Sequence, residues 1–254
     1  MIKGRNSNSI NIRWAFLIFG IFTLITGFFF SIMYLIERKE VNRPSQLEEK
    51  KSSPISKKYK IIVLFLAVNI FLFHVGSEIG FARLLTTFAV YYDLPGLNKQ
   101  IGAYMTSAFF IGFTFFRLFT IFMVNILGTK FTIFISAVII VIANCILVFL
   151  SSSITGLWVG IVLSGFGTSA VYPTLFALVD EYVTITSKIS SLFTIGCVIG
   201  EFAIPTIIGL FIKENPMFLI YMTACVSLFC IMLLGCLFFV FRMINNEKKA
   251  HMQH

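Results

Sequence analysis

The chain has 254 residues, of which 58% are hydrophobic and only 12% are charged. Average soluble domains are roughly 45–50% apolar and about 25% charged, because polar residues must cover a surface that faces water. The composition therefore disfavours a soluble enzyme, a disordered tail and a disulfide scaffold, and predicts that lipid surrounds most of the chain. The net charge of +9 does not indicate nucleic-acid binding, because eight of the twenty basic residues lie in one short polar segment, 38–60.

Seven apolar runs are each long enough to cross a membrane, since a spanning helix needs about 20 such residues. We therefore predict an all-α fold, that of a polytopic membrane protein with seven transmembrane helices. The predicted spans are residues 14–36, 60–87, 100–127, 130–150, 155–179, 189–212 and 217–241.

The polar segments between the spans predict the orientation of the chain. Thirteen basic residues fall on one side of the membrane, together with the longest polar segment, and five fall on the other side. The positive-inside rule places the basic-rich side in the cytoplasm. The predicted parts are an extracellular N-terminus with the first helix (1–36), a cytoplasmic linker (37–59), a six-helix bundle (60–242) and a cytoplasmic tail (243–254).

Seven spans fit two architectures. A seven-helix receptor is a remote alternative, because the chain lacks a DRY-like triplet after its third span, an NPxxY-like motif in its seventh and an extracellular cysteine pair. The spacing favours one span followed by two triplets, 60–150 and 155–241. The first helix of each triplet is polar and rich in Gly, at 69–80 and at 164–173. Inverted triplets with broken helices at corresponding positions are typical of secondary transporters and mark their binding sites.

Four short strings lie in the predicted spans: 73–81 (FHVGSEIGF), 116–118 (FRL), 172–178 (YPTLFAL) and 199–205 (IGEFAIP). They resemble the C-terminal half of the major facilitator superfamily, and most closely its sodium-dependent glucose transporter branch. The first is similar to the Val-Gly-Ala-Glu-Val segment of that branch, and the second to its Gly-Arg-Leu, with Phe in place of Gly. The other two resemble its tenth and eleventh helices.

The resemblance covers about residues 14–243. It implies that the first span is the family's sixth helix, that the linker is its central loop, and that the other spans are its seventh to twelfth helices. Members of the family have about twelve helices in two halves, with substrate at their interface. Five helices of that pattern are missing here. We favour a fragment of a longer transporter over a half-transporter that pairs with a separate chain.

Ionisable and amide groups inside the spans are the first candidate functional residues, because such groups are costly in lipid. Glu78 is a candidate for binding Na⁺ or a sugar hydroxyl; the alternative is a structural pair with Arg83 or a neighbouring helix. Asn69 suits sugar hydroxyls because an amide both donates and accepts, or else it forms an interhelical hydrogen bond. His74 lies one helical turn before Glu78, so the two form a candidate proton relay or a structural contact.

Three more residues are candidates for substrate binding. Glu201 is also a candidate for ion coupling or gating, against the alternative of a structural carboxylate. Trp158 is either a platform for a sugar ring or an anchor at the membrane interface. Tyr172 is the third. The residues predicted to act in gating or structure are Arg83, Arg117, Pro173 and Pro205.

The sequence predicts no cofactor, apart from Na⁺ as a candidate coupling ion, and no metal site. The five cysteines lie in apolar runs without a CxxC pair, as small buried side chains do. No phosphate loop, GxSxG or HExxH motif occurs, so we expect neither an enzyme nor an ATP-driven pump.

The predicted function is transport of a small polar solute, a glucose-like monosaccharide, by alternating access in a plasma membrane. The predicted partners are the lipid bilayer, the solute and the missing N-terminal half, and nucleic acid is not among them. The alternative is a truncated membrane protein that does not transport and acts as an interaction partner.

Overall fold

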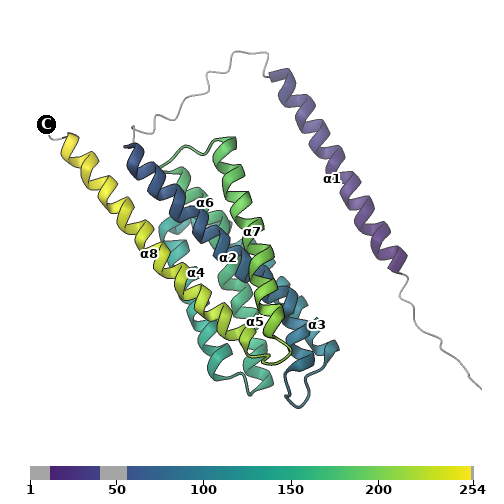
Figure 1. The fold of residues 1–254 in the computed structure, drawn as a ribbon. Coiled ribbons are helices and arrows are strands. Elements are labelled where there is room, and N and C mark those ends of the chain that lie inside the picture. The colour runs from purple at the N-terminus through teal and green to yellow at the C-terminus, as the bar shows by residue number, and fades with distance from the viewer. Residues whose placement is uncertain (1–11, 41–55, 253–254) are drawn as a thin grey trace, which may run out of the picture. The chain divides into compact units, whose positions relative to one another are not determined.

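The computed structural model describes residues 12–40 and 56–252, and these residues form eight α-helices (Figure 1). The described residues contain no strand, in agreement with the predicted all-α fold. The helices are α1 (Ile12–Glu40), α2 (Lys57–Tyr91), α3 (Lys99–Leu127), α4 (Thr129–Phe149), α5 (Ile154–Ser169), α6 (Val171–Asp180), α7 (Ser187–Phe211) and α8 (Phe218–Met252).

Seven segments among the described residues are long and apolar enough to cross a membrane, and α5 and α6 together make one of them. Each predicted span overlaps one of the seven. The helices extend a few residues beyond several predicted ends, because helical hydrogen bonds continue where the hydrocarbon core stops. The chain is therefore an integral, multi-pass membrane protein.

Helix α1 belongs to a unit separate from the other helices and is described by itself. Its described side chains from Trp14 to Ile36 are all exposed, and most are apolar. A helix that is apolar on every side is suited to lipid. Of the predicted linker, residues 41–55 lie outside the described part of the chain.

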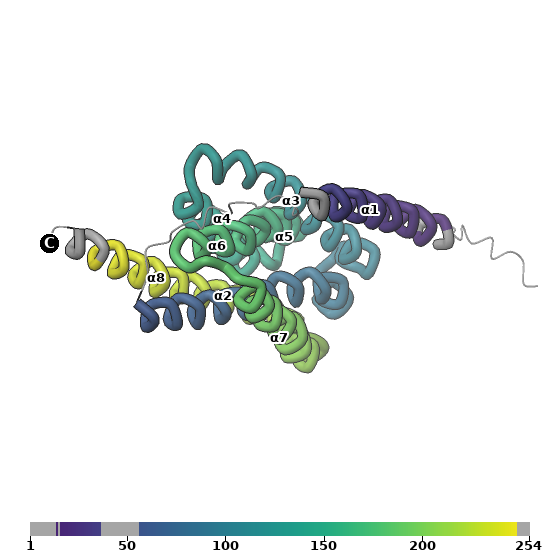
Figure 2. Tube along the Cα trace, turned by 90° about the horizontal axis from the view of Figure 1, so that it is seen from above, coloured from purple at the N-terminus to yellow at the C-terminus, as the bar shows by residue number. Residues whose placement is uncertain are grey.

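Helices α2 to α8 form a bundle in which the first helix of each triplet packs against two helices of the other triplet. Helix α2, the first of one triplet, packs against α7 and α8 of the other. Helix α5, the first of the second triplet, packs against α3 and α4. Figure 1 and Figure 2 both show α2 running beside α7 and α8. This reciprocal packing is the arrangement of three plus three helices expected from the sequence.

Two apolar clusters fill the bundle, one on each side of a polar layer. The first cluster includes Phe71, and the second includes Phe81, ten residues further along α2. Between the clusters lie polar side chains from α2 and α5. We call these residues the polar layer: His74, Ser77, Glu78, Ser164 and Thr168.

The break between α5 and α6 falls at Ala170, inside the predicted span 155–179. Pro173 explains it, because proline has no N–H to donate to the Ser169 carbonyl and its ring clashes with that oxygen. The sequence also predicted a break in the corresponding helix of the first triplet, and that prediction was wrong. Helix α2 is continuous from Lys57 to Tyr91. It contains glycines but no proline, so all its backbone donors remain available.

Helices α2 and α7 approach each other through small residues. A Cβ atom on Gly200 would collide with the Leu72 carbonyl oxygen, and one on Gly76 would lie 2.5 Å from the Gly200 carbonyl oxygen. One turn further on, a Cβ on Gly80 would lie 3.3 Å from Cγ of Pro205. The absence of side chains thus lets the two backbones meet, as in other membrane helix pairs. Helix α7 continues through Pro205 without a break.

Helix α8 extends past its predicted span, through residues predicted to form a polar tail, to Met252. Side chains beyond the span hold this end of the helix to the bundle. Tyr59 donates a hydrogen bond of 2.7 Å from its hydroxyl to Oε1 of Glu247. Asn245 donates from Nδ2 to the hydroxyl of Tyr182, whose ring stacks on Phe241.

We expect Gly200→Ala to destabilise the bundle by about 1–3 kcal/mol, because a methyl group would be forced into the α2 backbone. Thermal unfolding of the purified chain in detergent measures the effect. Gly209→Ala on the same helix is the matched control, because a Cβ there meets no atom within 4 Å. Equal losses of stability in the two variants would contradict the close approach of α2 and α7.

Candidate functional site

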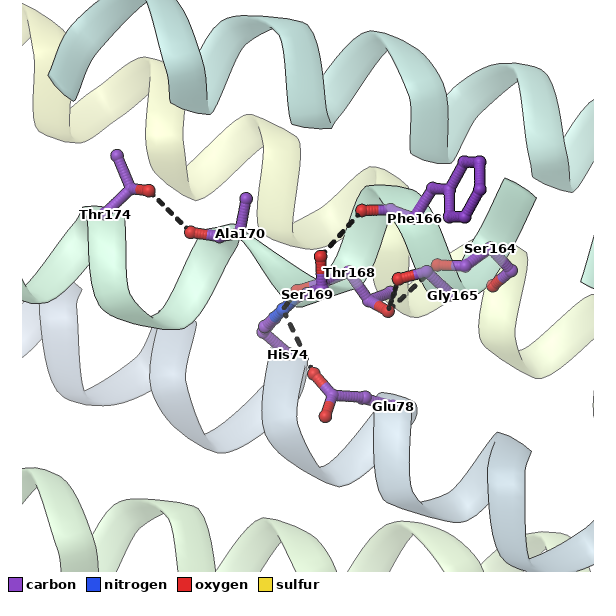
Figure 3. A network of polar contacts seen from close by, with 9 residues as sticks. All are labelled: His74, Glu78, Ser164, Gly165, Phe166, Thr168, Ser169, Ala170 and Thr174. Carbon is purple, nitrogen blue, oxygen red and sulfur yellow. Dashed lines mark hydrogen bonds and ion pairs between the residues drawn. The ribbon is translucent and has the colours of Figure 1, made fainter. Parts of the chain in front are cut away.

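His74 and Glu78 lie next to each other on α2 and face the break between α5 and α6 (Figure 3). Nε2 of His74 is 3.1 Å from the Thr168 carbonyl oxygen and 3.7 Å from Oε2 of Glu78. The first distance is that of a hydrogen bond, and the second is a longer electrostatic contact. One imidazole nitrogen therefore bridges a carboxylate on α2 and a backbone group at the end of α5.

The helix break accounts for this contact. Pro173 cannot complete the regular hydrogen-bond pattern, and the Ala170 N–H donates to the Thr168 carbonyl in a tighter turn. A carbonyl bonded in this irregular way at membrane depth needs a protein donor, because lipid offers none. His74 is buried and supplies that donor. We assign the proton of the neutral ring to Nε2 on this ground.

A small internal cavity adjoins the His74–Glu78 contact. Its volume is about 10 Å³, and the polar layer contributes much of its lining. A second cavity of about 20 Å³ lies on the other side of His74 and shares Ser227 and Cys230 with the first. Both cavities lie inside the bundle rather than on its outer surface.

A separate group of charges is exposed on the outside of α2, α3 and α7. Nη2 of Arg83 is 3.9 Å from Oε2 of Glu201, and these side chains are 62% and 35% exposed. Arg117 is also exposed, and its guanidinium lies 5.4 Å from the centre of the Phe113 ring. The charges of Arg117 and Glu201 both act on Glu78. We call Arg83, Arg117 and Glu201 the charged face.

The charged face changes one prediction made from the sequence. Glu78 does not pair with Arg83, which was one of its predicted structural partners. Arg83 pairs with Glu201 across the α2–α7 interface, and Glu78 pairs with His74. Spacing along one helix could not reveal this choice, because the partner of Arg83 comes from a helix more than a hundred residues away.

The remaining candidates lie in different surroundings. Asn69 donates from Nδ2 to the Phe65 carbonyl of its own helix at 2.8 Å, instead of to a neighbouring helix. Tyr172 is half-buried, and its ring lies 4.9 Å from that of Phe71. Trp158 is half-buried against the second apolar cluster, apart from the polar layer. The substrate-binding roles of these three residues stay predictions.

Two hydroxyl residues of α8 line the first cavity and were not among the sequence candidates. They are Thr223 and Ser227, spaced by one helical turn. Both donate to carbonyl oxygens four residues earlier in their helix. Two hydroxyls at this spacing in an apolar run are a usable signal of a polar stripe.

Within the described residues, no group of three or more His, Cys, Asp or Glu residues gathers to hold a metal ion.

The fold and the charged face together define a class of protein. Seven potential spans, two triplets whose first helices pack against the other triplet, and charged side chains on those spans are features of a transporter-type membrane bundle.

Comparison with known proteins gives the family. A family model described as Major Facilitator Superfamily matches residues 7–205. The chain therefore belongs to the Major Facilitator Superfamily. This agrees with the resemblance noted in the sequence.

Several curated relatives are transporters and not enzymes. The chain is similar to the Sodium-dependent glucose transporter 1 of Xenopus laevis, with 27% identity over 77% of this chain and 39% of that protein. It is also similar to the Sodium-dependent glucose transporter 1A of Mus musculus, with 26% identity over 82% of this chain and 48% of that protein. For the human Sodium-dependent glucose transporter 1 the identity is 24%, over 82% and 39%. The chain thus spans less than half the length of these relatives.

A solved structure shares the fold. The crystal structure of an auto-inhibited POT family peptide transporter matches with a TM-score of 0.61 and 16% identity. The match covers 69% of this chain and 37% of that chain. At this identity the likeness concerns the fold alone.

We expect His74→Leu to lower the stability of the bundle by about 1–3 kcal/mol, because the Thr168 carbonyl loses a buried donor. Thermal unfolding in detergent measures the loss. His74→Gln is the matched control, because its amide nitrogen can reach the position of Nε2 and restore the donor. A Gln variant as unstable as the Leu variant would show that ring packing, and not the hydrogen bond, holds α2 to the break.

Proposed function

We propose that this chain supplies the C-terminal half, and the helix before it, of a transporter that moves a monosaccharide by alternating access with Na⁺ as the coupling ion. The single observation that carries the proposal is the charged face. Two exposed guanidinium groups and one half-buried carboxylate lie on helices that cross the membrane.

Covering the charged face with lipid would cost free energy. A charged side chain at the bilayer centre costs about 2.5–3.5 kcal/mol on insertion scales. Exposed charges on spanning helices therefore require water or protein beside them instead of lipid. A second half packed across this face, with a water-filled solute path between the halves, meets that requirement.

The relatives support the choice of solute and ion. Several proteins similar to this chain carry the name sodium-dependent glucose transporter. The strings around Glu78, Arg117, Tyr172 and Glu201 are those that resemble this branch. Arg83, Arg117 and Glu201 offer donors and acceptors that suit sugar hydroxyls along the path.

The orientation and the missing half belong to the same proposal. The basic linker and the C-terminus lie in the cytoplasm and residues 1–36 begin outside, at the plasma membrane, as the distribution of basic residues favours. The missing half comes from a longer form of this chain or from a separate chain. Alternating access then consists of the two halves rocking about the solute path, with the α5–α6 break as a hinge.

Uptake of radiolabelled glucose tests the proposal. The assay uses cells that express the longer transcript or, if the message begins at Met1, this chain with a candidate second half. We expect uptake in Na⁺ medium that falls when choline replaces Na⁺. No glucose uptake under either condition would favour the non-transporting alternative.

Glu201→Gln should reduce this uptake by about tenfold, because losing about 1.4 kcal/mol of interaction at the charged face leaves Arg83 unpaired. Glu214→Gln is the control, since Glu214 is exposed in the turn between α7 and α8. The reversed pair Arg83→Glu with Glu201→Arg should recover part of the uptake. Full uptake by the Glu201→Gln variant would remove the charged face from the transport path.

A further inference from the structure

We propose that Glu78, Ser77 and Ser164 form a binding site for one dehydrated Na⁺ ion inside the six-helix bundle, apart from the solute path. This inference rests on the proposed function and assigns the coupling ion to a particular place. It predicts that ion and sugar bind to different surfaces of the same bundle.

The first observation is a pair of hydroxyl groups without partners. Ser77 and Ser164 are 6% and 4% exposed, and both line the cavity of about 10 Å³ beside Glu78. Neither hydroxyl makes a hydrogen bond with any described residue, unlike those of Thr168, Thr223 and Ser227, which donate to their own helices. No fully enclosed side-chain oxygen or nitrogen among the described residues lacks a partner, so both hydroxyls must reach open space. Their oxygens are therefore free to bind something in the cavity.

The second observation is the Glu78 carboxylate, which lines the same cavity. The Glu78 side chain is only 12% exposed, and its polar contact among the described residues is the 3.7 Å approach to His74. Arg83 is engaged by Glu201, and Glu201 repels the Glu78 charge while Arg117 attracts it from the exposed side. A buried carboxylate without a hydrogen-bond donor is costly. A cation in the cavity would remove that cost.

The volume of the cavity decides which ligand fits. About 10–15 Å³ of such space holds one water molecule, and this cavity has about 10 Å³. Pockets for small organic ligands measure about 300–1,000 Å³, so a monosaccharide cannot enter. The space admits one water molecule or one small ion without its water shell, and the buried carboxylate beside it favours the cation.

The chemistry of the lining distinguishes Na⁺ from a proton. A proton needs only one carboxylate oxygen and would leave the two serine hydroxyls without partners. A hard metal cation takes several oxygen ligands, charged and neutral together. One carboxylate and one hydroxyl from α2 and one hydroxyl from α5 supply such a set, and all of them line one cavity.

The site also lies against the hinge. His74 contacts Glu78 on one side and the Thr168 carbonyl at the α5–α6 break on the other (Figure 3). An ion bound to Glu78 repels a protonated imidazole, and the neutral ring keeps its Nε2–H on the Thr168 carbonyl. The ion site and the break are therefore in contact with the same side chain.

Binding of radioactive sodium to the purified chain in lipid nanodiscs tests the site without any transport step. We expect saturable binding in which Li⁺ competes better than the larger K⁺, because the cavity is small. Glu78→Gln should weaken binding by about tenfold or more, because it removes the one anionic ligand. Ser77→Ala and Ser164→Ala should each weaken it by a smaller factor and keep the proposal testable if Glu78→Gln fails to fold.

Two control variants test whether Na⁺ binds at Glu78 and not elsewhere on the chain. Glu214→Gln removes an exposed carboxylate outside the bundle and should bind Na⁺ normally. Glu201→Gln alters the charged face, whose charge acts on Glu78, and should change Na⁺ binding much less than Glu78→Gln does. No saturable Na⁺ binding by the unmodified chain, or binding that depends on Glu201 and not on Glu78, overturns the proposal.

The two proposals fail in different ways. If the chain binds Na⁺ through Glu78 but the assembled transporter moves no glucose, the proposed function fails and the ion site stands. If glucose uptake depends on Na⁺ but Glu78→Gln leaves both uptake and ion binding unchanged, the ion site fails and the proposed function stands.

Discussion

The absence of water in the bilayer core is the constraint on which this structure depends. Every backbone donor and acceptor at that depth must find a partner within the protein, which is why the described segments are helices. Pro173 interrupts that pattern between α5 and α6, and His74 on α2 supplies a donor to the Thr168 carbonyl beside the gap. One hydrogen bond thus joins the first helices of the two triplets at the middle of the bundle.

Around that hydrogen bond, the bundle separates two kinds of polar surface. The polar layer is enclosed between two apolar clusters and surrounds a space of about the size of one water molecule. The charged face is open, and its guanidinium and carboxylate groups need water or a second protein half beside them. Size and exposure suit the enclosed surface to an ion and the open surface to a solute, with Glu78 near the boundary between them.

The packing of α2 connects these surfaces to motion. Glycines at the α2–α7 contact bring the two backbones together, and Pro205 packs against Gly80. Such contacts hold the helices at close range without interlocking side chains, which permits small sliding movements. The break at Ala170 provides a second flexible point on the opposite side of α2. Alternating access needs elements of this kind on both sides of a central path.

The sequence alone determined the number of spans and the triplet pattern, because each depends on local composition. It also identified Glu78, His74, Arg117 and Glu201, since ionisable residues are conspicuous in apolar runs. It did not determine that Arg83 pairs with Glu201, or that α2 stays continuous. Only the tertiary structure decided these points and brought Ser164 and Glu78 to the same cavity. Contacts between helices depend on which faces the helices turn toward each other, and the spacing of residues along one helix does not determine this.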